Sequence, residues 1–264
     1  MSVPDGKGMR GAGRGIHVSS RLRWTVAAVG VTLMALSLPS CVVCGEKYDL
    51  VDLTTENHTV ELDGAESVVV NVDMGVGQLM IGGGAKELAE AEFRYNVAEW
   101  RPEISYEVVN GRGILHITQP DAEGGKSAPN KAENRWLIAL SDDVEMELQV
   151  DSGVGEVKLD LGGLALTDLE VDHGVGEILI DLSGHRVSDM NATIDGGIGS
   201  IKVIVPSSVG VRLDGDTGIG SFKAAGFAKS GGAFVNDAYN RADTTIRLSI
   251  DAGIGEVKVL TDEA

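Results

Sequence analysis

Five aspartates recur in the C-terminal half of the chain, each followed by the pattern x-Gly-Val/Ile-Gly. They are separated by 21, 23, 21 and 35 residues: Asp151, Asp172, Asp195, Asp216 and Asp251. Carboxylates stacked one strand spacing apart repel each other, and bound calcium would relieve that repulsion. The known calcium-binding solenoid repeat, however, places its glycines before the aspartate and repeats every nine residues. The favoured interpretation is that each aspartate faces solvent and caps the glycine turn after it, and a calcium column is the less favoured alternative.

Charged residues also recur after the glycines. A glutamate follows the aspartate by five residues in three repeats, and a lysine follows by seven in four repeats: Glu156, Glu177, Glu256, Lys158, Lys202, Lys223 and Lys258. Opposite charges two residues apart share one face of a strand and can pair between neighbouring strands. These columns therefore predict a solvated, mutually paired face.

No motif for phosphate binding or catalysis stands in a suitable setting. The segment GVGEVK lacks the strand–loop–helix context of a nucleotide site, and GGGAKEL, which begins at Gly82, lacks the Lys-Ser/Thr ending. Neither G-x-S-x-G nor H-E-x-x-H occurs in the chain. The sequence thus predicts a protein with no catalytic residues and no cofactor. A carbohydrate-active β-solenoid enzyme is kept as an alternative, because a stacked aspartate column resembles a carboxylate cluster.

The period of about 21 residues predicts how these residues are positioned. Counted from each aspartate, apolar residues occupy odd offsets before the second glycine and even offsets after it. The odd set includes the position three after the aspartate, which is expected to point inward: Val154, Val175, Ile198, Ile219 and Ile254. Because strand side chains alternate with a period of 2, the change of phase requires a bulge or corner, which the second glycine suits.

These patterns predict an all-β protein whose residues 135–264 form a short right-handed β-solenoid of about five coils. A β-rich N-terminal domain is expected at 59–120 and a linker at 121–134. The first of these contains an outlying sixth copy of the repeat at Asp73, an Asn110-Gly111 hairpin turn, and a segment at 85–91 compatible with a short helix. A dozen inserted residues before the last repeat concentrate aromatic side chains in a chain that has few: Phe222, Phe227, Phe234 and Tyr239. They predict a cap on the solenoid end, or a contact patch for a partner.

The N-terminus has the layout of an export signal. Residues 24–43 carry no charge and five basic residues precede them. The stretch Leu38-Pro39-Ser40-Cys41 resembles a bacterial lipobox, which predicts lipidation of Cys41 within a signal or anchor segment at 1–40. An uncleaved membrane-spanning helix is the alternative, and both place the rest of the chain outside the cytoplasmic membrane, beyond a tether at 41–58. That exported part has a net charge of −22, which excludes nucleic acid as a partner.

The region from Thr59 to Gln119, followed by repeats of D-x-G-[VI]-G-[ES]-[VI], resembles the toastrack proteins of the bacterial envelope. The solenoid resembles the C-terminal domains of cell-wall-active-antibiotic response proteins. The resemblance implies a β-rich region joined to a short solenoid, and a role in protein interaction and envelope-stress signalling. We therefore expect a non-catalytic, envelope-anchored interaction or scaffold protein with membrane lipid and an envelope protein as partners. A calcium-stabilised surface adhesin is a further alternative.

Overall fold

The computed structural model describes residues 48–120, 128–186 and 188–262. Apart from one turn of 3-10 helix, η1 (Ala98–Trp100), the regular elements in these ranges are β-strands, so the all-β prediction is confirmed. The strands are β1 (Leu50–Val60), β2 (Ser67–Gly82), β3 (Ala89–Val97), β4 (Glu103–Val109), β5 (Arg112–Thr118), β6 (Asn134–Leu140), β7 (Glu145–Asp160), β8 (Leu166–Asp181), β9 (Met190–Val205), β10 (Gly210–Ala225), β11 (Ala228–Ser230), β12 (Ala233–Val235) and β13 (Thr245–Thr261).

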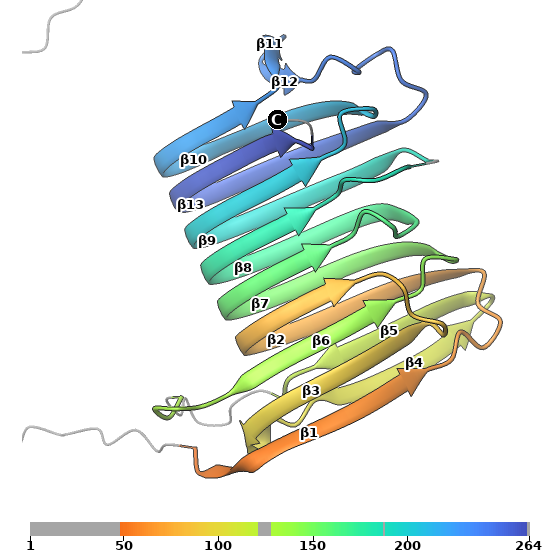
Figure 1. Cartoon of the computed structure of the whole chain (residues 1–264), viewed down its shortest axis with the longest axis vertical. Helices are drawn as coiled ribbons and strands as arrows, with labels where there is room; N and C mark the ends of the chain where they lie inside the picture. The colour runs from red at the N-terminus through yellow and green to blue at the C-terminus, as the bar shows by residue number, and fades with distance from the viewer. Residues whose placement is uncertain (1–47, 121–127, 187, 263–264) are drawn as a thin grey trace, which may run out of the picture. The chain divides into compact units, whose positions relative to one another are not determined.

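Six long strands form the body of the protein, and each of them bends at its glycines into two legs (Figure 1). They are β2, β7, β8, β9, β13 and β10, stacked in that order with parallel pairing along both legs. The repeat aspartates lie in register throughout, so that Asp151 is opposite both Asp73 and Asp172. The open, stacked sheet agrees with the predicted solenoid-like repeat.

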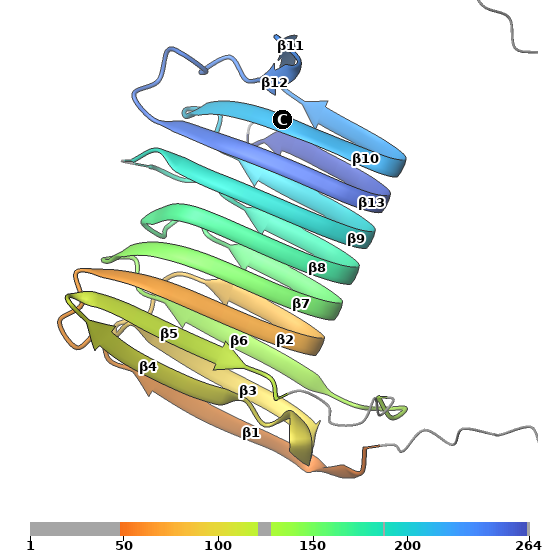
Figure 2. The same cartoon turned by 180° about the vertical axis from the view of Figure 1, so that it is seen from behind.

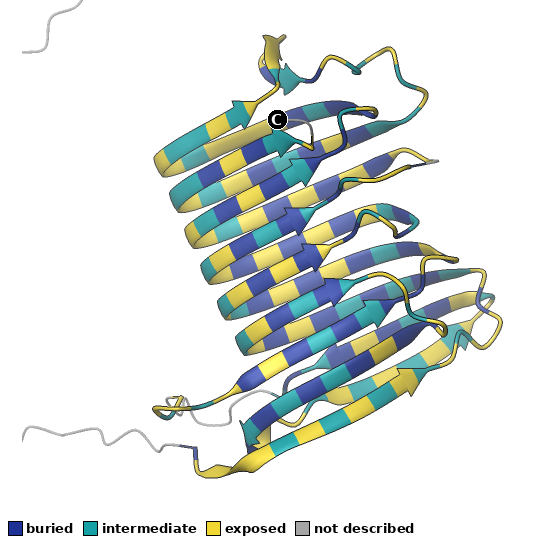
Figure 3. Ribbon diagram, in the orientation of Figure 1, coloured by how far each residue is buried: buried dark blue, intermediate teal, exposed yellow. Residues whose placement is uncertain are grey.

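The two legs of the stack form two layers that enclose a single core. The first leg of β2 pairs with β5, which pairs with β4, and the second leg pairs with β6, which is followed by β3 and β1. Aliphatic side chains from both layers fill the space between them, and buried residues alternate with exposed ones along each leg (Figure 3). Full burial of each such aliphatic side chain stabilises the fold by about 1.5–3 kcal/mol.

The order of the coils in space differs from their order in the sequence. After β9 the chain skips one position to form β10, makes the short hairpin β11–β12, and returns so that β13 fills the gap between β9 and β10 (Figures 1 and 2). The insertion before the last repeat supplies the length of chain that this return requires. The C-terminal repeat is therefore an internal coil, and β10 with its hairpin forms one end of the stack.

The structure tests the predicted hairpin turn, the short helix and the division into domains. The β4–β5 hairpin turns at Asn110 and Gly111, which have φ of 53° and 80°, as the Asn-Gly pair predicts. The helix allowed at 85–91 is wrong, because β3 begins at Ala89 and pairs with both β1 and β6. The described residues belong to one compact unit, in which β2 stacks directly on β7, so strands from the two predicted domains share one sheet.

Candidate functional site: the corner of the stack

The corner of each coil is shaped by its second glycine. Gly155, Gly176, Gly199, Gly220 and Gly255 have φ between 144° and 153°, a region that side chains with a Cβ rarely adopt. A Cβ added to Gly176 would also collide with the carbonyl oxygen of Gly155 on the neighbouring coil. Glycine therefore sets both the bend and the close spacing of the coils at this edge.

The aliphatic residue between the two glycines points outward, which corrects the sequence prediction that this set points into the core. The exposed fractions are 48% for Val154, 43% for Val175, 53% for Ile198, 69% for Ile219 and 46% for Ile254. The chain turns before the second glycine, so the inward set ends at the residue after the aspartate, two residues earlier than the spacing indicated. Val76 of β2 stands at the same register position. We call these six aligned side chains the corner ladder.

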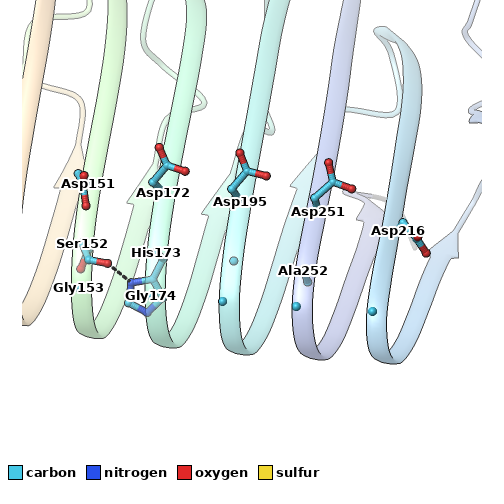
Figure 4. Close-up of a pocket in the computed structure, with 14 residues that line it drawn as sticks. Asp151, Ser152, Gly153, Asp172, His173, Gly174, Asp195, Asp216, Asp251 and Ala252 are labelled. Atoms are coloured by element: carbon cyan, nitrogen blue, oxygen red, sulfur yellow. Dashed lines mark hydrogen bonds between the residues drawn. The ribbon is translucent and has the colours of Figure 1, made fainter.

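The aspartates form a parallel row three residues before the corner ladder, as Figure 4 shows for five of them. All five predicted aspartates are exposed, and together with the residues that follow them they line an open groove of about 660 Å³. Asp216 accepts a hydrogen bond from the N–H of Thr217 at 2.8 Å, which is a local turn contact. Partial burial, together with the charges of Asp172 and Asp251, raises the pKa of Asp195.

A metal ion needs several donors that converge on one point, and the aspartate row has a different arrangement. Within 48–120, 128–186 and 188–262, no group of three or more His, Cys, Asp or Glu side chains is placed to hold a metal ion. The row instead spreads its carboxylates one per coil along the stack. Whether calcium stabilises the aspartate row is therefore to be tested by its removal with EDTA.

In the coils of β7 and β8 the residue after the aspartate is buried at the corner, a feature that the sequence pattern did not predict. His173 is 5% exposed and Ser152 on the next coil is 2% exposed. The His173 Nδ1 lies 3.1 Å from the Ser152 carbonyl oxygen, which can only accept, so Nδ1 carries the proton (Figure 4). Burial lowers the pKa of His173, and the neutral ring fills a position that other coils give to smaller side chains such as Ala252. Histidine has a structural role here.

On the other side of the corner ladder, the predicted glutamate and lysine columns lie on the outer face of the second leg. Lys223 Nζ of β10 is 2.7 Å from Glu256 of β13, and Lys258 is 3.8 Å from the same carboxylate. In the first two coils, the amide of Gln78 donates to Glu156 at 3.2 Å. Such exposed pairs each contribute little to stability, about 0–1 kcal/mol.

The four aromatic partner-contact candidates lie at the β10 end of the stack. Phe222 and Phe234 stack with ring centroids 5.8 Å apart, the Lys229 ammonium lies 5.2 Å from the Phe234 ring, and Phe227 is partly buried against the same core. The strand β12, which carries Phe234, pairs antiparallel with β10, and Tyr239 is half-buried in the loop that follows. These contacts are those of a cap over the last coil.

The N-terminal predictions fall on residues that the structure does not describe. The signal or anchor segment 1–40 and the lipidation candidate Cys41 lie outside the described residues. Among the residues that are described, none belongs to a helix long and apolar enough to cross a membrane.

Comparison with known families and structures places this architecture. The family model described as the N-terminal domain of toast_rack, DUF2154, matches residues 51–204. The model described as cell wall-active antibiotics response LiaF, C-terminal, matches residues 154–259. Among curated proteins, none matches the chain significantly.

Solved structures include one strong likeness. A candidate cell adhesion protein from Clostridium sporogenes is 34% identical, with a TM-score of 0.78 over 80% of this chain and 100% of that chain. A candidate adhesin from Bacteroides fragilis is 12% identical with a TM-score of 0.22, covering 79% of this chain and 97% of its own. One from Parabacteroides distasonis is 14% identical with a TM-score of 0.26, covering 78% and 97%. The last two similarities are too low to support an argument.

Proposed function

This chain belongs to the toast-rack family of LiaF-related proteins, and we propose that it is a non-catalytic interaction protein of the bacterial cell envelope that binds a protein partner along the corner ladder. Its family relatives support a role in the response to cell-wall stress. The similar Clostridium structure, described as a candidate cell adhesion protein, supports binding to another macromolecule.

The exposed corner ladder is the observation that carries the proposal. Isolated apolar residues are normal on a protein surface, but a contiguous apolar strip costs solubility and marks an interaction surface. Here one aliphatic side chain per coil is exposed by 43–69% over five successive repeats. Glycines on both sides leave the strip accessible, and their tight packing makes it rigid, so little conformational entropy is lost on binding.

The charges beside the ladder indicate what kind of partner fits. The aspartate row runs along one side of the ladder, whereas the glutamates on the other side lie beside the lysine column, as in the pairing of Glu256 with Lys223. An apolar strip beside an acidic row complements a protein surface that has aliphatic residues flanked on one side by lysine or arginine. The aspartate charges repel the anionic surface of a bacterial membrane, so a membrane surface is not expected to lie along the ladder.

Site-specific photocross-linking in living cells tests the proposal. A photoreactive residue placed at Ile198 or Ile254 should give a discrete protein adduct, because both positions are in the ladder. The same residue at Lys202, which is also exposed on β9, is the matched control. Equal adducts at all three positions, or none at the ladder positions, would refute the role of the ladder. Mass analysis of the mature N-terminus, with Cys41→Ala as control, separately tests the lipid anchor.

A further inference from the structure

A second groove lies at the N-terminal end of the stack and shares no residue with the aspartate row. Its volume is about 600 Å³, and it is lined by β2, β3, β6, η1, the corner of β7 and residues 128–133. Its charged lining residues are Arg94, Lys131, Arg135 and Glu133, with a net charge of +2. A positive groove is exceptional here, because the chain after residue 40 has a net charge of −22.

Two of these cations occupy facing positions on neighbouring strands. Arg94 of β3 and Arg135 of β6 are directly opposite each other in an antiparallel pair, an arrangement in which like charges destabilise a sheet. In the part of the chain that the structure describes, no carboxylate forms an ion pair with either guanidinium. The contact of Arg135 is with the Met80 sulfur at 3.4 Å, a weak acceptor. The pair therefore does not serve the stability of the sheet.

The third cation is held in an unfavourable backbone conformation. Lys131 has φ of 73°, in a turn closed by the Ala132 N–H donating to the Pro129 carbonyl at 3.1 Å. The position suits glycine or asparagine better than lysine. Asn96 holds this segment to β3, because its side chain donates to the Lys131 carbonyl at 2.9 Å and accepts from the Glu133 N–H at 2.7 Å. Strain that is held by specific contacts points to a functional position.

The remaining walls of the groove are rigid and partly apolar. Trp100 is 3% exposed and packs edge-on against Tyr48, and Val76 and Ala132 pack beside them. Below them, the Asn134 side chain donates to the Gln119 side chain at 2.9 Å and accepts from the Trp136 indole at 3.0 Å. Such a buried, satisfied network fixes the backbone that carries Arg135. The groove therefore combines three cationic side chains, carried on a well-held backbone, with an apolar wall.

We propose that this groove binds a phosphate group carried on an apolar body, as in a lipid phosphate. Paired guanidinium forks with an ammonium group are suited to an oxyanion. A phosphate monoester carries about −1.5 to −2 charges at neutral pH, close to the +2 of the lining, whereas a carboxylate carries only one. A free phosphate ion would leave the apolar wall and most of the volume empty. Nucleic acid is excluded because the rest of the surface is strongly acidic.

Calorimetric titration of the full chain, kept in solution with a maltoside detergent, tests the proposal. The probe is hexyl phosphate. Inorganic phosphate tests the phosphate group without the tail, hexanoate tests a single negative charge on a tail of the same length, and 1-hexanol tests the tail alone. Hexyl phosphate should bind at least tenfold more tightly than each of the other three, and more weakly as salt is raised. Inorganic phosphate binding equally well would overturn the lipid-type ligand, and hexanoate binding equally well would overturn phosphate.

Variants then locate the binding. Arg94→Gln combined with Arg135→Gln should weaken hexyl phosphate binding at least tenfold, while the double lysine variant keeps the charge and retains part of the affinity. The matched control replaces Arg212 and Arg247, which are paired with Asp214 and Asp189, by glutamine and should bind as the parent does. Undiminished binding by the double glutamine variant would overturn the site. Because the double glutamine variant removes a like-charge contact, its melting temperature should not fall below that of the parent. If the double glutamine variant unfolds, the test rests on the double lysine variant, whose affinity for hexyl phosphate should be lower than that of the parent.

Discussion

Replacement of Gly199 by alanine tests whether glycine corners hold the stack together. Gly199 has φ of 148°, and a Cβ there would collide with the carbonyl oxygen of Gly176 on β8. The backbone conformation alone costs about 1–3 kcal/mol for a residue other than glycine. Relief of the collision requires neighbouring coils to separate, which weakens about two backbone hydrogen bonds of about 1 kcal/mol each. We expect the free energy of unfolding to fall by about 4 kcal/mol, a large part of the stability of a typical domain.

Gly232→Ala is the matched control for this measurement. Gly232 also has a positive φ, 93°, but a Cβ there has nothing within 4 Å. It should lose only the backbone term of about 1–2 kcal/mol. Urea unfolding of both variants, followed by circular dichroism and by tryptophan fluorescence, gives the two free energies. Equal losses, or a loss below about 1 kcal/mol for Gly199→Ala, would refute the idea that close approach at the corner sets the coil spacing.

Four further predictions concern calcium, two aspartates and the strained turn. Since the described residues do not bring three metal donors together, removal of calcium with EDTA should shift the melting temperature by less than about 2 °C, and a larger fall would favour the calcium-stabilised adhesin. The pKa of Asp195 is raised, so its ionised carboxylate costs stability above that folded-state pKa, and the cost disappears as pH falls through it. Asp195→Asn should therefore stabilise the fold by about 0.5 kcal/mol at pH 7, a small value because the side chain is exposed. Near pH 3 the same substitution should have no effect on stability. Asp189→Asn should have the opposite sign at pH 7, because hydrogen bonds from the Thr245 N–H and Arg247 lower the pKa of Asp189. Lys131→Gly should raise the free energy of unfolding by about 1 kcal/mol through relief of its positive φ, and should weaken hexyl phosphate binding; a loss of stability would show that the turn is not strained.

The repeat spacing was sufficient to predict the stacked coils and the outward aspartate row. A period of about 21 residues brings equivalent positions opposite each other, and Asp172 lies between Asp151 and Asp195 as the alignment requires. The prediction failed at the corner ladder because alternation of sides holds only along an extended strand. Near Gly155 the chain turns, so Val154 is exposed although its offset matches the buried set.

The sequence pattern could not predict features that depend on pairing between strands that are distant in the chain. The unusual 35-residue interval before Asp251 was visible, but it signals only extra chain, and not that β13 returns between β9 and β10. The opposed Arg94 and Arg135 are 41 positions apart and become neighbours only through the antiparallel pairing of β3 with β6. The burial of His173 also could not be predicted, because it depends on the corner geometry and the equivalent positions hold Ser, Gly, Thr or Ala.

The two ends of the stack are unlike, and this difference suggests how the surfaces divide their roles. At the β10 end, the β11–β12 hairpin pairs with part of the first leg of β10, and its aromatic residues pack against the core of the last coil. At the opposite end, the positive groove lies beside the start of the corner ladder, since Val76 and Val154 line the groove and also belong to the ladder. A ligand in the groove therefore contacts the first two positions of the surface that we propose for a protein partner. Binding at the groove should then alter cross-linking most at the β2 and β7 positions, and least at Ile219 on β10.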